Sequence, residues 1–270
     1  MTVSKSLRFV GAVLCLCLFT ITANAATDVI HGSVFEFGSP DDLDLNQVVI
    51  AVGVFNESDK DVNGVMFRTA GQAGGSGTAT EGGVTATITA ANQINNWAAA
   101  PPAFTGGTPG SAANLGEIMQ DIRWAAAPNP ITVLIEGLNP GSLYKLQLLT
   151  NEGADRTRHW DVGVSDGAVA AIDNLVVDNI SSEGDNTIPG VWTADNSFGY
   201  EGQFVASAAG TLTAIMQQEI PGGLPQEGGD NNPILQAVVV NATIPEPSTL
   251  VLAALGLLTL AGSRFRRRRR

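Results

Sequence analysis

Short runs rich in valine, isoleucine, threonine and aromatic residues recur along the chain, and glycine, asparagine, aspartate or proline bounds them. This pattern, with almost no helical period, is typical of an all-β chain. It predicts eleven strands, at Val29–Phe37, Val48–Phe55, Val65–Thr69, Val84–Thr89, Ile131–Glu136, Leu143–Thr150, Trp160–Val164, Val169–Val177, Tyr200–Ala206, Thr211–Gln217 and Ile234–Asn241. We therefore expect a single β-sandwich domain over residues 26–243.

Two stretches interrupt this rhythm. Gly71–Gly83 is rich in glycine, serine and threonine, and Asn95–Gly116 mixes tryptophan, alanine, proline and glycine, so both are predicted to be long loops. One short helix is predicted within Ala112–Trp124, because Leu115, Ile118, Met119 and Ile122 follow a helical spacing. We expect this helix to cap the sandwich.

The turn Asn139-Pro140-Gly141 introduces a clear alternation, in which Leu143, Lys145 and Gln147 share one strand face and Tyr144, Leu146 and Leu148 share the other. A tyrosine just after such a turn resembles the tyrosine corner of Greek-key sandwiches. That resemblance implies that the Tyr144 hydroxyl binds back to the preceding loop.

The first 25 residues have the pattern of a secretory signal peptide. Lys5 and Arg8 form a short basic region, and the apolar run Phe9–Ile21 follows it. An N-terminal membrane anchor is the alternative, but the apolar run is short. The small residues of the expected cleavage site, after Ala25, are Ala23, Ala25 and Ala26.

The other end of the chain carries an uncharged apolar segment, Ser248–Ser263, which is predicted to form a helix. It is short for a membrane span, which needs roughly 17–25 residues, so it would span only with flanking residues or in a thinned bilayer. Arg264 and Arg266–Arg270 follow it directly, and such a cluster stays in the cytoplasm. The chain before this segment is therefore expected to lie outside.

The triplet Pro245-Glu246-Pro247, the apolar segment and the terminal arginines together resemble the PEP-CTERM sorting signal of bacteria. The resemblance covers residues 244–270. It implies that an exosortase recognises the chain, removes the tail and delivers the protein to the cell surface or extracellular matrix. Contact with the membrane would then be transient. A plain C-terminal membrane anchor is the alternative.

Without the two end segments, the chain contains six basic and 25 acidic residues, a formal net charge of −19. Such a charge repels phosphate backbones and anionic lipids, which argues against nucleic acid as a partner, and it suits divalent cations. Cys15 and Cys17 both lie in the predicted signal peptide. No disulfide or thiolate site is therefore expected in the mature domain.

The stretch Asp59-Lys60-Asp61-Val62-Asn63-Gly64 fits the opening of a calcium loop, in which oxygens of Asp59, Asp61 and Asn63 would converge on the ion. The closing acidic residue of that loop is missing, because Ala70 stands there. The same residues fit a hairpin turn, so calcium is only a possible cofactor.

The residues Arg156, Arg158, Trp160 and Asp161 follow the Tyr144 strand, and with Val62–Phe67 they resemble the jelly-roll, carbohydrate-binding-like domains of exported bacterial proteins. This implies a jelly-roll-like sandwich with a glycan site on that loop, where an arginine fork binds hydroxyls or carboxylates. Alternatively, the arginines pair with nearby carboxylates. Trp160 shares a strand face with Val162 and Val164, which favours a place in the core.

Three functions are compatible with these features. The first is a non-enzymatic surface or matrix protein with a structural or adhesive role. The second is a carbohydrate-binding module that stacks sugars of an extracellular polysaccharide on Trp97, Trp124, Trp160 or Trp192. The third is a carbohydrate-active hydrolase that uses two of the many carboxylates. The sequence contains only two histidines and no nucleophile, zinc or phosphate-loop motif, so we do not expect an enzyme.

Overall fold

The computed structural model describes residues 32–97, 103–126, 129–151, 159–165, 176–181, 186–187, 197–217 and 232–243. The predicted signal peptide, the Pro-Glu-Pro triplet and the apolar tail lie outside this part of the chain. Within it, no helix is long and apolar enough to cross a membrane.

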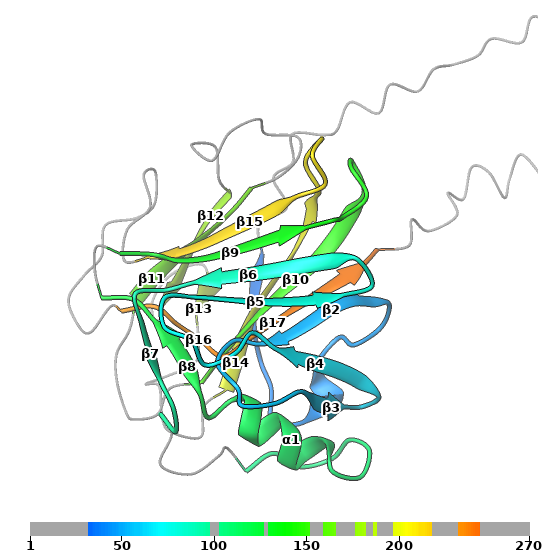
Figure 1. Ribbon diagram of the computed structural model, residues 1–270, viewed down its shortest axis with the longest axis vertical. Helices are drawn as coiled ribbons and strands as arrows, with labels where there is room; N and C mark the ends of the chain where they lie inside the picture. The colour runs from blue at the N-terminus through cyan, green and yellow to red at the C-terminus, as the bar shows by residue number, and fades with distance from the viewer. Residues whose placement is uncertain are drawn as a thin grey trace, which may run out of the picture.

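Two seven-stranded sheets make up most of the described chain (Figure 1). The first sheet has the strand order β1 (Ser33–Glu36), β14 (Ser197–Val205), β10 (Leu143–Asn151), β17 (Ala237–Ala242), β2 (Val48–Gly53), β4 (Val65–Thr69) and β3 (Lys60–Val62). The second has the order β13 (Asn186–Thr187), β12 (Val176–Ser181), β11 (His159–Val164), β15 (Leu212–Gln217), β9 (Ile131–Glu136), β6 (Val84–Thr89) and β5 (Ser76–Glu81). Neighbouring strands are antiparallel, apart from the parallel pairs β2/β4 and β12/β13.

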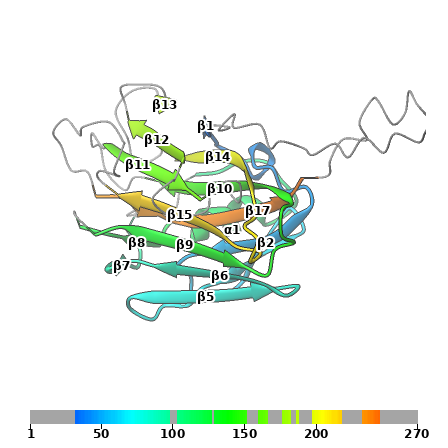
Figure 2. The same ribbon diagram turned by 90° about the horizontal axis from the view of Figure 1, so that it is seen from above.

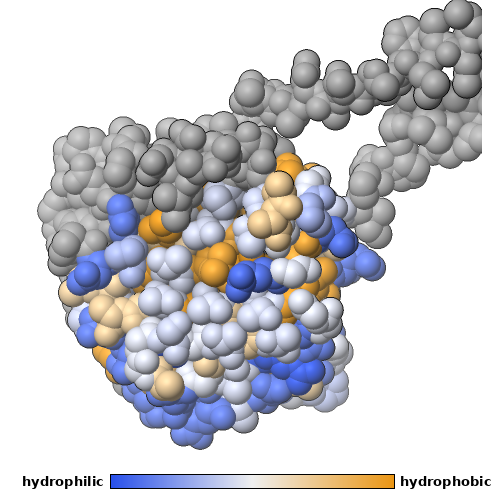
Figure 3. Space-filling model, turned by 45° about the horizontal axis from the view of Figure 1, so that its top comes forward, coloured by the Kyte–Doolittle hydropathy of each residue, from blue (hydrophilic) through white to orange (hydrophobic). Residues whose placement is uncertain are grey.

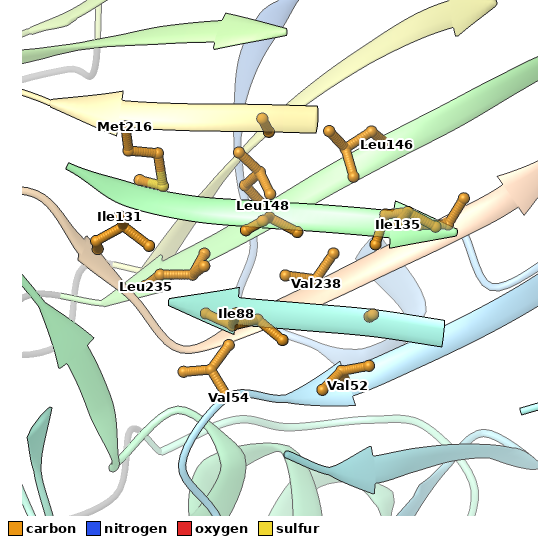
Figure 4. Close-up of a cluster of buried hydrophobic side chains, with 14 of the residues drawn as sticks. Val52, Val54, Ile88, Ile131, Ile135, Leu146, Leu148, Met216, Leu235 and Val238 are labelled. Atoms are coloured by element: carbon orange, nitrogen blue, oxygen red, sulfur yellow. The ribbon is translucent and has the colours of Figure 1, made fainter. Parts of the chain in front are cut away.

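The two sheets lie face to face as the layers of a sandwich (Figure 2). Alternate residues of each strand point inward, so Leu146 and Leu148 of β10 meet Ile131 and Ile135 of β9 in one hydrophobic core (Figure 4). The prediction of an all-β sandwich is therefore confirmed.

The outer face of the first sheet is covered as well. The helix α1 (Ser111–Ile118) and the 3-10 turn η1 (Pro40–Asp42) lie over it, and Leu115 and Ile118 join Phe67, Leu149 and Val239 in a second core. A strand that is buried on both faces needs apolar residues at every position, which explains the unbroken run Ala237–Val240 in β17.

The tyrosine corner is confirmed. The Tyr144 hydroxyl accepts a hydrogen bond of 2.9 Å from the backbone N–H of Asn139. Tyr144 lies in the main core with Leu146 and Leu148, as the alternation predicts. The turn and the strand that follows it are thereby joined by a buried side chain.

A small third sheet corrects the predicted helix. It has the order β16 (Ile234–Leu235), β8 (Ile122–Trp124) and β7 (Asn92–Ile94). The helix α1 ends at Ile118 with Met119 as its C-cap, and Ile122 belongs to β8, because strands distant in sequence pair with β8 on both sides. The predicted last strand is likewise divided, into β16 and β17.

The prediction of a loop at Gly71–Gly83 is wrong, because β5 runs through it. Its inward side chains are small, Gly77 and Ala79, and its outward ones are hydroxyls, so the strand lacks the apolar alternation used to find strands. The sequence nevertheless contains a strong signal for a hairpin turn. Gly82 and Gly83 both have positive φ and form the two-residue turn between β5 and β6.

The tyrosine corner gives a direct test of this architecture. We expect Tyr144→Phe to destabilise the mature domain by about 1 kcal/mol, because the Asn139 N–H loses its buried partner. Chemical unfolding measures the change, and circular dichroism should remain β-rich. An unchanged free energy of unfolding would show that the corner does not hold this turn.

Candidate functional site

The predicted glycan loop leaves the first sheet where β10 ends, at Asn151. Arg156, Arg158 and Trp192 lie outside the described residues. Trp160 and Asp161 lie in β11, between β12 and β15, and Val162 and Val164 of the same strand are buried in the main core. Trp97 and Trp124 are partly buried against that core.

Two buried polar residues, not predicted from the sequence, lie where this loop begins. Asn151 of β10 and Ser197 of β14 are directly opposed in the ladder, and both are buried. The Oδ1 and Nδ2 atoms of Asn151 and the Oγ of Ser197 have no hydrogen-bond partner. Buried polar groups are nearly always satisfied, so this pair would gain from water or a polar ligand.

The backbone at Asn151 is fixed by an unusual side-chain contact. Gln236, between β16 and β17, accepts a hydrogen bond of 3.0 Å from the Asn151 N–H and donates to the Asn151 carbonyl. The Gln236 amide therefore continues the strand ladder where β17 does not reach. The backbone of Asn151 is therefore fully hydrogen-bonded to Gln236, although its side chain is unpaired.

The calcium candidates form the β3–β4 hairpin. Asn63 and Gly64 have φ of 52° and 80°, as a two-residue hairpin turn requires, and the Gly64 N–H donates to Asp61. Asp59 accepts from the Thr69 N–H and pairs with Arg68, and Asn63 binds Asp41 and Thr108. These oxygens therefore have three different sets of protein partners. In the described part of the chain, no three acidic, histidine or cysteine side chains form a metal cluster.

Every basic side chain in the described residues has a protein partner. Lys60 pairs with Glu117, Arg68 pairs with Asp59 and Glu81, and Lys145 pairs with Asp44 at 3.2 Å and Glu201 at 2.7 Å. Burial raises the pKa of Asp44, but hydrogen bonds from Asn46 and the ammonium of Lys145 outweigh it, so the pKa is lowered overall.

Arg123 of β8 differs from the other three in that its partners are neutral carbonyls and not carboxylates. It is fully buried, and its guanidinium donates to the carbonyls of Val54, Gly71, Ala73 and Gly75 at 2.7–3.2 Å. The guanidinium also lies 5.3 Å from the centre of the Phe55 ring. Desolvation lowers the pKa of Arg123.

A groove of about 360 Å³ separates the first halves of β2 and β4. These parallel strands pair only from Ala51 and Phe67 onward, so their beginnings diverge. Val48, Val65 and Met66 line the groove, and Met66 is 37% exposed. The groove lies beside Gln47, whose carbonyl accepts from the N–H of Ala242 at the end of β17.

One family model matches the chain, that of the PEP-CTERM protein-sorting motif, over residues 243–270. The match implies an exported protein that is anchored in the membrane and then processed by an exosortase. It confirms the sorting signal predicted from Pro245, Glu246 and Pro247. No curated protein and no solved structure is significantly similar to the chain.

Asp121 provides a pH-dependent test. Burial raises the pKa of its carboxyl group, although the Asn96 N–H donates to it at 2.8 Å and opposes that effect. A raised pKa in the folded state means that Asp121 lowers stability as the pH rises above the ordinary pKa of about 3.9. Asn has the same shape and keeps the acceptor. We therefore expect Asp121→Asn to be more stable than the wild type at pH 7.

The comparison at low pH supplies the control. Below pH 3.9 the wild-type carboxyl is protonated and uncharged, so the difference between the two proteins should shrink. Thermal unfolding at several pH values measures it. A variant that is less stable at pH 7, or a difference independent of pH, would contradict this assignment.

Proposed function

We propose that this chain is a non-enzymatic protein of the bacterial cell surface or extracellular matrix, with a structural or adhesive role. The observation that carries the proposal is the position of the sorting motif. It begins at Thr243, immediately after β17, and β17 lies in the middle of the first sheet between β10 and β2. The tail is thus attached to a central strand without an intervening linker.

This attachment supports a defined orientation of the domain. The strand β17 ends beside Leu143 and Gln47, and Thr243 donates from its N–H to the Leu143 carbonyl. Asn151 and Ser197 lie at the opposite end of the same sheet. A domain held through residue 243 would therefore present its Asn151 end away from the membrane.

The two hydrophobic cores support the proposal of a stable, non-catalytic domain. No cysteine follows residue 17, so the domain depends on burial between its two sheets and beneath α1. Its described cations are engaged in ion pairs or, for Arg123, with backbone carbonyls. A stable domain of this kind is suited to displaying a binding surface to its surroundings.

A second candidate function is carbohydrate binding at the Asn151 end. The unpaired amide of Asn151 and hydroxyl of Ser197 favour it, since both can bind the hydroxyls of a sugar. Arg156, Arg158, Trp160 and Asp161 are its proposed contacts, and an extracellular polysaccharide is the proposed partner. Calcium at Asp59, Asp61 and Asn63 would require those oxygens to leave their present partners.

Sorting is tested by mass spectrometry of the exported protein. We expect a C-terminus near Pro245–Pro247, because the arginine cluster halts export and holds the triplet at the outer face of the membrane. The double variant Pro245→Ala/Pro247→Ala keeps the apolar segment and the arginines, and should remain uncut in the membrane fraction. Wild-type surface protein that still ends in Arg270 would contradict the proposal.

A further inference from the structure

The outward face of the second sheet carries an ordered group of hydroxyls. Strands β5, β6, β9 and β15 alternate, with apolar or glycine residues inward, apart from Glu81 at the end of β5, and mostly serine or threonine outward. We call this surface the hydroxyl face, and it consists of Ser76, Thr78, Thr80, Thr85, Thr87, Thr89, Thr132 and Thr213.

The strand register arranges these side chains in rows. Across the β5–β6 hairpin the opposed hydroxyl oxygens form hydrogen bonds, at 3.0 Å for Ser76 and Thr89, 3.3 Å for Thr78 and Thr87, and 3.1 Å for Thr80 and Thr85. Thr89 is in turn opposed to Thr132 of β9. Neighbouring strand backbones lie roughly 5 Å apart, and successive outward residues of one strand lie about 7 Å apart along it.

The hydroxyl face is almost uncharged, in contrast to a mature domain of net charge −19. Among the outward positions of β5, β6, β9 and β15, only Glu136 at the end of β9 is charged. Figure 3 shows a broad pale area of intermediate hydropathy, with most strongly hydrophilic residues around it and one such group beside a hydrophobic patch near the middle of the view.

The composition of the hydroxyl face limits the chemical class of partner that it can bind. The described basic side chains are all engaged elsewhere, so the face offers no cation to an acidic polymer. Leu134 and Ile215 are its large apolar side chains, and both are partly buried, which leaves little area for an apolar partner. A second copy of this domain would bring two bodies of net charge −19 together. A neutral, hydroxyl-rich partner meets none of these penalties.

The face is also preorganised for many weak polar contacts. Each paired hydroxyl uses one hydrogen bond across the strands and keeps further donor or acceptor capacity for a partner. Threonine is stiff at χ1, so little side-chain entropy is lost on binding. Repeated weak contacts along one polymer add through effective concentration.

We propose that the hydroxyl face binds an extended, neutral polysaccharide that lies across β5, β6 and β9. The inference deepens the proposed adhesive role and rests on it. The surface differs from the loop of Arg156 and Arg158, because it lies on the side of the sandwich and uses hydroxyls in place of cations and aromatic rings.

The experiment uses the mature protein, residues 26–243, and four polymers. Cellulose, starch and dextran are the neutral probes, and alginate is the carboxylated control. We expect the wild type to be retained on at least one neutral polymer and not on alginate. The variant Thr78→Val/Thr80→Val/Thr85→Val/Thr87→Val should bind at least tenfold more weakly, because valine keeps the strand shape but not the hydroxyl.

Two further variants keep the test decisive. Thr87→Val should weaken binding on its own, whereas Thr105→Val, at an exposed threonine outside the face, should not. Their melting temperatures report on folding. Retention on no neutral polymer, or unchanged retention of the fourfold variant, would overturn the proposal.

The remaining outcomes separate this inference from the proposed function. Binding lost only in Arg156→Ala/Arg158→Ala would assign the glycan to the loop and overturn the hydroxyl face. Sedimentation that shows a dimer of the wild type but not of the fourfold variant would assign the face to a second copy, which also overturns it. Failure of the proposed function is read separately, from an uncut C-terminal tail.

Discussion

The buried guanidinium of Arg123 is the contact on which the arrangement of this domain depends. It lies on β8, in the small third sheet, and binds carbonyls at the end of β2 and in the segment before β5. It therefore joins the end of β2 in the first sheet, and the segment before β5 in the second, to the segment that follows α1. Gly77 of β5 must be a glycine here, since a Cβ atom would come within 2.6 Å of the guanidinium. The cation donates here to several backbone carbonyls at once, the buried one of Val54 and the part-buried ones of Gly71, Ala73 and Gly75.

This use of positive charge has a functional consequence. The described basic residues are engaged within the domain, so its surface is acidic, or neutral where threonine predominates. Such a surface repels acidic polymers and accommodates neutral ones. The sorting tail leaves from the central strand β17, at the end of the first sheet opposite Asn151. The sorting signal at the C-terminal end is thereby combined with the proposed binding face on the side of the sandwich.

The alternation of apolar and polar residues along the sequence predicted those strands that have one apolar and one polar face. The bounds of β4, β6 and β9 agree with the prediction at both ends, and the hydroxyl of Tyr144 binds back to its turn as expected. The prediction was wrong where contacts between residues far apart in the sequence determine the secondary structure. The residue Ile122 continues a helical spacing but pairs with β7, and β5 has no large apolar residue at all. The role of Arg123 was also invisible, because four carbonyls distant in sequence leave no pattern of side chains. The unpaired Asn151 likewise looked like an ordinary strand end.

Equilibrium unfolding of Arg123→Met tests the central claim most directly. Methionine fills much of the same space but leaves the buried carbonyl of Val54 and three part-buried carbonyls without this donor, so we predict a loss of about 1–3 kcal/mol. Arg68→Ala is the matched control. Its partners Asp59 and Glu81 are more than a third exposed, and we expect little change. An Arg123→Met domain as stable as the wild type would contradict the view that this buried cation holds the sheets and the helix segment together.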